Sequence, residues 1–173
     1  MRLLLSIFLS QILAVAIARQ GHASVEIISG VASEGQSAVQ LTSAATGFDA
    51  PKVQPINGTT FDWWYFDVVS PDLDYSLVLV FFDSTSNGLW AGIPDVGSST
   101  YASFVISMPD GSSVNGNAVG SDLVVRTLEN GSSGTLNETG WSWIGLPDMS
   151  LYELIIDSPG TGVQGNVTFN SVS

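Results

Sequence analysis

The chain has 173 residues, enough for one domain with a hydrophobic core, and 16 acidic side chains against four basic ones. A net charge of −12 repels phosphate groups, so we expect no nucleic-acid partner. The chain has no cysteine and its single histidine, His22, precedes the domain, which excludes thiolate chemistry, Ser-His-Asp triads and histidine zinc sites within it.

The N-terminal segment has the pattern of a secretory signal peptide. Met1-Arg2 is basic, residues 3–18 are almost entirely apolar, and Ala16-Ile17-Ala18 has the spacing of a cleavage site. We predict a signal peptide over residues 1–18, with cleavage as late as residue 23 as the alternative. The apolar run of about 16 residues is shorter than the roughly 20 that a bilayer requires. We therefore expect a secreted or lumenal protein without stable membrane insertion.

Residues 24–50 are rich in Gly, Ser and Ala and are predicted to form an extended arm, with one short strand over Val25–Ile28. From residue 51 onward, short runs of β-branched and aromatic residues alternate with turn signals, including Asn115-Gly116-Asn117 and Asn130-Gly131. A minor helix is expected at 146–149. Further strands are predicted at 59–69, 75–83, 101–108, 114–119, 122–128, 141–146, 150–157 and 165–172.

This spacing, about eight to twelve residues per strand, is typical of an all-β antiparallel sandwich or barrel. Residues 51–173 are therefore predicted to form one β domain. The chain stops inside or just after a strand-like run, at Phe169-Asn170-Ser171-Val172-Ser173, which favours a truncated chain.

One strand concentrates the aromatic residues: Phe61-Asp62-Trp63-Trp64-Tyr65-Phe66-Asp67. Because side chains alternate along a strand, Trp64 and Phe66 share a face with Asp62, and Trp63 and Tyr65 lie on the other. Both faces are apolar. We therefore expect the core to cover one face, and another segment, a second domain or a ligand cavity to cover the other.

The residues available for chemistry are carboxylates, hydroxyls, amides and aromatic rings. Asp62 is flanked by Trp and Phe side chains and would lose hydration, which raises the pKa of its carboxyl group. With a raised pKa it would act as a hydrogen-bond donor or general acid. Tyr65 has a phenol that would hold a carbonyl oxygen. These two are the candidate catalytic residues. A cavity for a hydrophobic, conjugated small molecule is predicted to be lined by Trp63, Trp64, Phe66 and Phe82.

Four Asn-x-Ser/Thr sequons follow the predicted signal peptide. In a eukaryotic secretory chain such sequons are glycan acceptors. The predicted glycosylation sites are Asn57, Asn130, Asn137 and Asn166.

The aromatic strand resembles the signature strand of the lipocalin-like carotenoid 1,2-hydratase superfamily, usually Glu-Trp-Trp-Tyr-Phe-Asp. Within it, the chain is most similar to the fungal Diels–Alderases of secondary-metabolite clusters. The similarity extends to the lead-in 51–56, to 78–82 and to Trp141-x-Trp143. Position 62 departs from the family pattern, because Asp stands where the superfamily usually has Glu.

The resemblance implies a lipocalin-like N-terminal domain over 51–173, truncated before a second β domain, with the active cavity between or within the two. It implies a (hetero-)Diels–Alder cycloaddition of a polyketide- or terpenoid-derived intermediate without a metal or a cofactor. Two alternatives stay open: an isoprenoid alkene hydratase or isomerase in which Asp62 protonates the double bond, and a secreted domain that binds hydrophobic small molecules or sugars without turnover.

Overall fold

The computed structural model describes residues 23–40, 47–88 and 96–171. The predicted signal peptide lies outside these residues. The described residues form strands and turns, with no helix among them. Accordingly, this part of the chain contains no helix of the length and apolarity that a membrane span requires.

Six strands form the larger sheet, in the order β1-β8-β9-β10-β11-β12, and every neighbouring pair is antiparallel. Their bounds are β1 Ala23–Ser29, β8 Asp122–Leu128, β9 Gly131–Leu136, β10 Trp141–Gly145, β11 Leu151–Ser158 and β12 Val163–Asn170.

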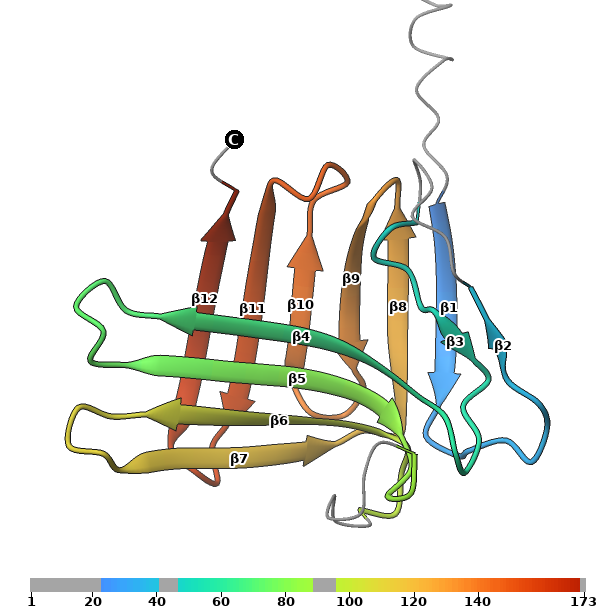
Figure 1. Ribbon diagram of the computed structural model, residues 1–173, viewed down its shortest axis with the longest axis horizontal. Coiled ribbons are helices and arrows are strands. Elements are labelled where there is room, and N and C mark those ends of the chain that lie inside the picture. Colours follow the sequence, from blue (N-terminus) through green and yellow to red (C-terminus); the bar gives the residue numbers. More distant parts are fainter. Residues whose placement is uncertain (1–22, 41–46, 89–95, 172–173) are drawn as a thin grey trace, which may run out of the picture.

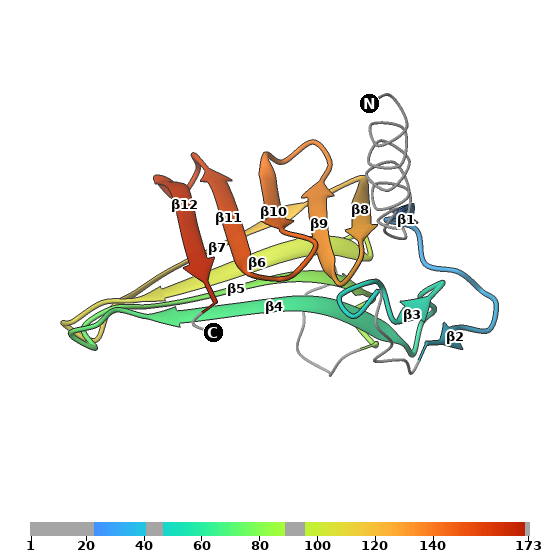
Figure 2. The same ribbon diagram turned by 90° about the horizontal axis from the view of Figure 1, so that it is seen from above.

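Four strands form the second sheet, in the order β4-β5-β6-β7, again antiparallel throughout. Their bounds are β4 Phe61–Val69, β5 Ser76–Ser84, β6 Thr100–Ser107 and β7 Ser113–Val119. A small antiparallel pair, β2 (Ala38–Val39) and β3 (Val53–Gln54), lies beside them. The sheets face one another as two layers whose strands run across each other (Figures 1 and 2). The prediction of an all-β antiparallel sandwich is confirmed.

The space between the sheets is filled by large apolar side chains. Trp143 of β10 is fully buried, and its ring centroid lies 4.7 Å from that of Phe81 and 4.9 Å from that of Trp64. Trp141, two residues earlier on the same face, is 1% exposed and packs on Phe104. Each such ring buries roughly 150–250 Å². These aromatic side chains therefore hold the two layers together.

Several local expectations differ from the structure. β9 was not predicted, because it has no alternating apolar pattern. The expected turn at 115–117 is the middle of β7, and residues 146–149 form a turn instead of a helix. The short strand expected at Val25–Ile28 is present as β1. It pairs with β8 along seven residues, so the start of the expected arm is an edge strand of the larger sheet.

The aromatic strand β4 is covered on one face only. Trp64 points into the core and is 5% exposed. On the outer face, Phe61, Trp63 and Tyr65 keep 36%, 42% and 52% of their surface exposed. The expectation of cover on both faces is therefore not met by the described residues.

Candidate active site

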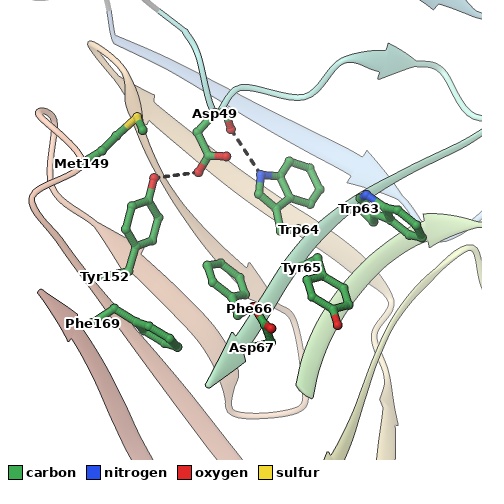
Figure 3. A pocket seen from close by; sticks show the side chains of 9 residues that line it. All are labelled: Asp49, Trp63, Trp64, Tyr65, Phe66, Asp67, Met149, Tyr152 and Phe169. Atoms are coloured by element: carbon green, nitrogen blue, oxygen red, sulfur yellow. Dashed lines mark hydrogen bonds between the residues drawn. The ribbon is translucent and has the colours of Figure 1, made fainter. Parts of the chain in front are cut away.

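A pocket of about 430 Å³ opens along the edge of β4 that has no partner strand in the described residues (Figure 3). Its volume lies in the range of roughly 300–1,000 Å³ that small-molecule sites occupy. It is lined by Asp49, Trp63, Trp64, Tyr65, Phe66, Asp67, Met149, Tyr152 and Phe169. Because β4 is an edge strand, side chains from both of its faces border the opening.

The inner wall of the pocket is aromatic and fixed by the core behind it. The Phe66 ring centroid lies 5.9 Å from that of Tyr152 and 6.4 Å from that of Phe169, which come from β11 and β12. Trp64 and Phe66 both pack against Trp143. The wall is therefore built from both sheets, and its shape depends on how they pack.

Asp49 reaches this wall from the loop before β3, and the loop is anchored at several points. The Asp49 N–H donates to Asn130 O at 3.1 Å, and the N–H of Gly47 donates to Glu129 O at 2.5 Å. The indole N–H of Trp64 donates to the backbone oxygen of Asp49 at 3.2 Å. The backbone at Asp49 is thus tied both to the β8–β9 turn and to β4.

The carboxyl group of Asp49 is held by two hydroxyl groups. Its Oδ2 accepts hydrogen bonds from Ser132 Oγ at 2.6 Å and from Tyr152 Oη at 2.8 Å. Ser132 Oγ in turn accepts from the Trp143 indole N–H at 3.0 Å. Burial raises the pKa of Asp49, against the lowering effect of these hydrogen bonds and of Lys52. Burial, with Asp49 close by, also raises the pKa of Tyr152, so the phenol keeps its proton.

The structure does not bring Asp62 into this pocket. Its Oδ2 accepts the backbone N–H groups of Lys52 and Val53 at 2.6 and 3.1 Å, and its Oδ1 accepts that of Trp63 at 2.9 Å. Burial raises the pKa of Asp62, and these backbone hydrogen bonds oppose the rise. Asp62 therefore ties the β3 segment to β4, and it lines a separate pocket beside Phe61.

The remaining predicted residues divide between the pocket and the outer face. Trp63, Trp64, Tyr65 and Phe66 all line the pocket, Trp63 and Tyr65 from its outer rim. Phe82 does not line it. It lies on the outer face of the four-stranded sheet and stacks on Tyr101 with ring centroids 4.7 Å apart.

The four sequon asparagines differ in accessibility. Asn57 Nδ2 donates to Gly35 O, and its Oδ1 accepts from the next two threonines. Asn137 Nδ2 donates to Asp122, and the Oδ1 of Asn130 is buried without a partner. Only Asn166, on β12, is exposed among the four.

Sequence reasoning missed Asp49, Met149, Tyr152 and Phe169 as pocket residues. Asp49 lies in a segment without periodicity, and it is 103 positions from its partner Tyr152. No local pattern can pair residues so far apart. Within the described residues, no three His, Cys, Asp or Glu side chains are grouped closely enough to hold a metal ion.

The fold and the pocket together define a β-sandwich protein with an aromatic-walled pocket and a carboxyl–phenol pair at its side. The family model described as Diels-Alderase-like matches residues 22–173, and the chain belongs to this family. The resemblance read from the aromatic strand is confirmed.

Two relatives are named quinolone epoxide rearrangement proteins. One, asqO of Emericella nidulans (strain FGSC A4), is 36% identical over 147 residues, which are 80% of this chain and 38% of the relative. The other, penF of Penicillium thymicola, is 31% identical over 144 residues, 79% of this chain and 39% of the relative. The chain therefore spans about two fifths of the length of these relatives.

The crystal structure of CghA with Sch210972 has a similar fold, with a TM-score of 0.67 and 19% sequence identity. The match covers 87% of this chain and 39% of that one. The likeness supports the fold assignment.

Proposed function

We propose that this chain forms part of an enzyme of secondary metabolism that cyclises or rearranges an apolar intermediate. The reaction takes place in the pocket lined by Asp49, Phe66 and Tyr152, which we call the β4 pocket. This reaction is a cofactor-free (hetero-)Diels–Alder cycloaddition of a polyketide- or terpenoid-derived substrate. The observation that carries the proposal is the pocket itself, an aromatic wall fixed by both sheets with one carboxyl–phenol pair. A cycloaddition needs a shape that restrains the substrate and a donor near an oxygen that gains charge, and it needs no nucleophile.

Deletion of the gene in the source organism tests this proposal. We expect loss of a cyclic metabolite and accumulation of its uncyclised precursor, both restored by the full gene. A gene carrying Phe66→Leu changes the wall and should restore the cyclic product only weakly. Tyr75→Leu, an exposed ring that does not line the pocket, serves as the control. An unchanged metabolite profile after deletion would contradict the proposal.

The names of the relatives favour a second reaction in the same pocket, the rearrangement of an epoxide. Such a reaction benefits from a donor to the epoxide oxygen, a role that Asp49 would fill. The deletion strain separates the two reactions, because an epoxide accumulates in one case and an unsaturated open-chain precursor in the other.

The two other hypotheses have less support. Alkene hydration by Asp62 conflicts with its position, since its oxygens accept three backbone N–H groups outside the pocket. Ligand binding without turnover predicts a protein that binds the precursor and leaves it unchanged. Entry into the secretory pathway remains our proposal from the pattern of residues 1–18.

A further inference from the structure

The two oxygens of the Asp49 carboxyl group have different surroundings. Oδ2 accepts two hydrogen bonds, from Ser132 and Tyr152, and a carboxylate oxygen has about two acceptor sites. No described residue donates a hydrogen bond to Oδ1. Oδ1 is also absent from the set of fully buried side-chain atoms without a hydrogen-bond partner. A proton bound to this carboxyl group would therefore be on Oδ1, at the wall of the pocket that Asp49 lines (Figure 3).

We infer that Asp49 is the residue that binds the oxygen atom of the ligand: its protonated Oδ1 donates a hydrogen bond to a carbonyl or epoxide oxygen of an otherwise apolar molecule. Tyr152 and Ser132 are positioning residues, because they fix Oδ2 and thereby the direction in which Oδ1 points. Trp143 holds Ser132 from behind. The inference rests on the proposed function in taking the β4 pocket as the ligand site, and it names the chemical class of the ligand.

The surroundings of Asp49 shift its pKa upward, in the direction of the protonated form. Burial raises its pKa, and the carboxylate of Asp62 acts in the same direction. The hydrogen bonds from Ser132 and Tyr152 oppose this rise, and so does the charge of Lys52, whose ammonium group donates to the backbone oxygen of Gly47 at 2.6 Å. Tyr152 stays a neutral phenol, and Tyr65 and Asp67 are the other titratable side chains that line the pocket. The hydrogen bond to a ligand should therefore weaken as pH rises.

The hydrogen bond gives the pocket a chemical preference that aromatic packing alone does not produce. Rings alone favour the hydrocarbon over a ketone of similar shape, because the ketone oxygen loses its hydrogen bonds to water on entering an apolar pocket. A single neutral hydrogen bond is worth about 0.5–1.5 kcal/mol net, and the upper end corresponds to roughly tenfold in affinity. A matched pair of ligands that differ in one oxygen atom isolates this contribution.

Benzophenone and diphenylmethane are such a pair, with C=O in one where the other has CH₂. We would measure their dissociation constants for the chain lacking residues 1–22 by equilibrium dialysis at pH 5 and pH 8. At pH 5 we expect benzophenone to bind up to about tenfold more tightly, and at pH 8 the preference should shrink. The infrared C=O stretch of bound benzophenone should shift to lower frequency at pH 5.

Three variants identify the donor. Asp49→Leu should lose the preference at both pH values, with the variant's own affinity for diphenylmethane as the reference. Asp49→Asn keeps the shape and a donor group, so its preference should no longer depend on pH. Tyr152→Phe keeps the ring in the wall and should reduce the preference several-fold, again measured against the variant's own affinity for diphenylmethane. Circular dichroism and melting curves check that each variant is folded.

The inference is overturned by equal binding of both ligands at pH 5, by a preference that grows with pH, or by a preference that survives in Asp49→Leu. The proposed function has its own test in the metabolite profile. If the cyclic metabolite depends on the gene but the ligand preference is absent, the proposed enzymatic function is supported and the proposed role of Asp49 is wrong. If the preference is present but deletion changes no metabolite, Asp49 is supported as a ligand-binding residue and the proposed enzymatic function is wrong.

Discussion

At the scale of single residues, Asp83 is a buried carboxyl group with too few partners. It lies at the end of β5, directly across from Asp62 of β4, and is 1% exposed. Gln54 Nε2 donates to its Oδ2 at 3.1 Å, while Oδ1 is buried without a partner. Burial raises the pKa of Asp83 to about 7, with a further contribution from Asp62. The group is therefore protonated in the folded state across mildly acidic pH.

This pKa makes the stability of the fold depend on pH in a definite direction. The folded value of about 7 lies above the ordinary value of 3.8, so the stabilisation is complete below pH 3.8 and is lost as pH rises toward 7. At about 1.36 kcal/mol for each tenfold change in proton affinity, the full loss is roughly 4 kcal/mol. Asp83→Asn resembles the protonated form, and we expect it to remove most of this slope and to be more stable than the wild type at pH 8.

Urea unfolding of both proteins at pH 4.5, 6 and 8 measures the effect. The other carboxyl groups with altered pKa values are common to the two proteins, so the difference between them isolates Asp83. Stability curves that run parallel with pH would show that Asp83 keeps its charge in the fold.

At the scale of elements, β9 is a strand that the pattern of the sequence does not predict. Its residues Gly131-Ser132-Ser133-Gly134-Thr135-Leu136 are small and polar apart from Leu136, and they lack the run of β-branched and aromatic residues that predicts strands such as β4 and β5. The glycines are needed for space: a Cβ on Gly134 would lie 2.0 Å from the Trp143 ring, and one on Gly131 would lie 1.9 Å from the backbone oxygen of Leu146. Small residues therefore mark the place where β10 packs its tryptophan flat against the neighbouring strand.

Replacing Gly134 by Ala should consequently be costly. Trp143 is fully buried between the sheets and has no space to shift, so we expect a loss of about 3 kcal/mol in the free energy of unfolding, the upper end for overpacking. Gly160→Ala is the control, because a Cβ there meets nothing within 4 Å, and it should change stability by less than about 0.5 kcal/mol. Thermal or urea unfolding compares the two, and equal stabilities would contradict the packing argument.

The exposure of the sequon asparagines also depends on the strands and turns in which they lie. Asn166 lies on the edge strand β12, and among the described residues its side-chain amide donates one hydrogen bond, to the half-buried Glu153 at 2.6 Å. The amides or carbonyls of the other three are engaged or buried. In a eukaryotic secretory host we expect Asn166→Gln to remove more of the mobility shift caused by N-glycosidase than Asn130→Gln does. Equal losses in the two variants would contradict this ranking.

The sequence predicts those features of the fold and the pocket that depend on residues close together in the chain. Strands that are runs of apolar, β-branched and aromatic residues, such as β4, β5 and β8, were predicted within about two residues, because this composition is a local signal. The pair β2–β3 is too short to show a pattern. The pocket was predicted in part: β4 supplies Trp64 and Phe66, but the contact of Asp49 with Tyr152 depends on the packing of distant segments.

At the scale of the whole molecule, the outer face of the four-stranded sheet carries an exposed aromatic stripe, which we define as Phe61, Trp63 and Tyr65. Its rings follow one another along β4 with centroids 5.5 and 6.4 Å apart, and Trp63 also contacts Phe82 edge-on at 6.4 Å. Contiguous exposed apolar surface on soluble proteins marks binding or association sites. The stripe is therefore where this chain should bind apolar dyes or associate with itself.

We expect the chain lacking residues 1–22 to bind 8-anilinonaphthalene-1-sulfonate and to form dimers or larger species through the aromatic stripe. A double variant, Trp63→Thr with Tyr65→Thr, keeps strand propensity and should reduce both effects with little change in melting temperature. Tyr75→Thr removes a ring that is 48% exposed outside the stripe and serves as the control. Without residues 1–22 the chain keeps 16 acidic side chains against the two basic ones Lys52 and Arg126, a net charge of −14 that pushes copies apart, so association should strengthen as salt screens this repulsion. Sedimentation velocity at low and high salt measures it. Association that is equal in the double variant, or that weakens with salt, would place the contact on a charged surface elsewhere on the molecule.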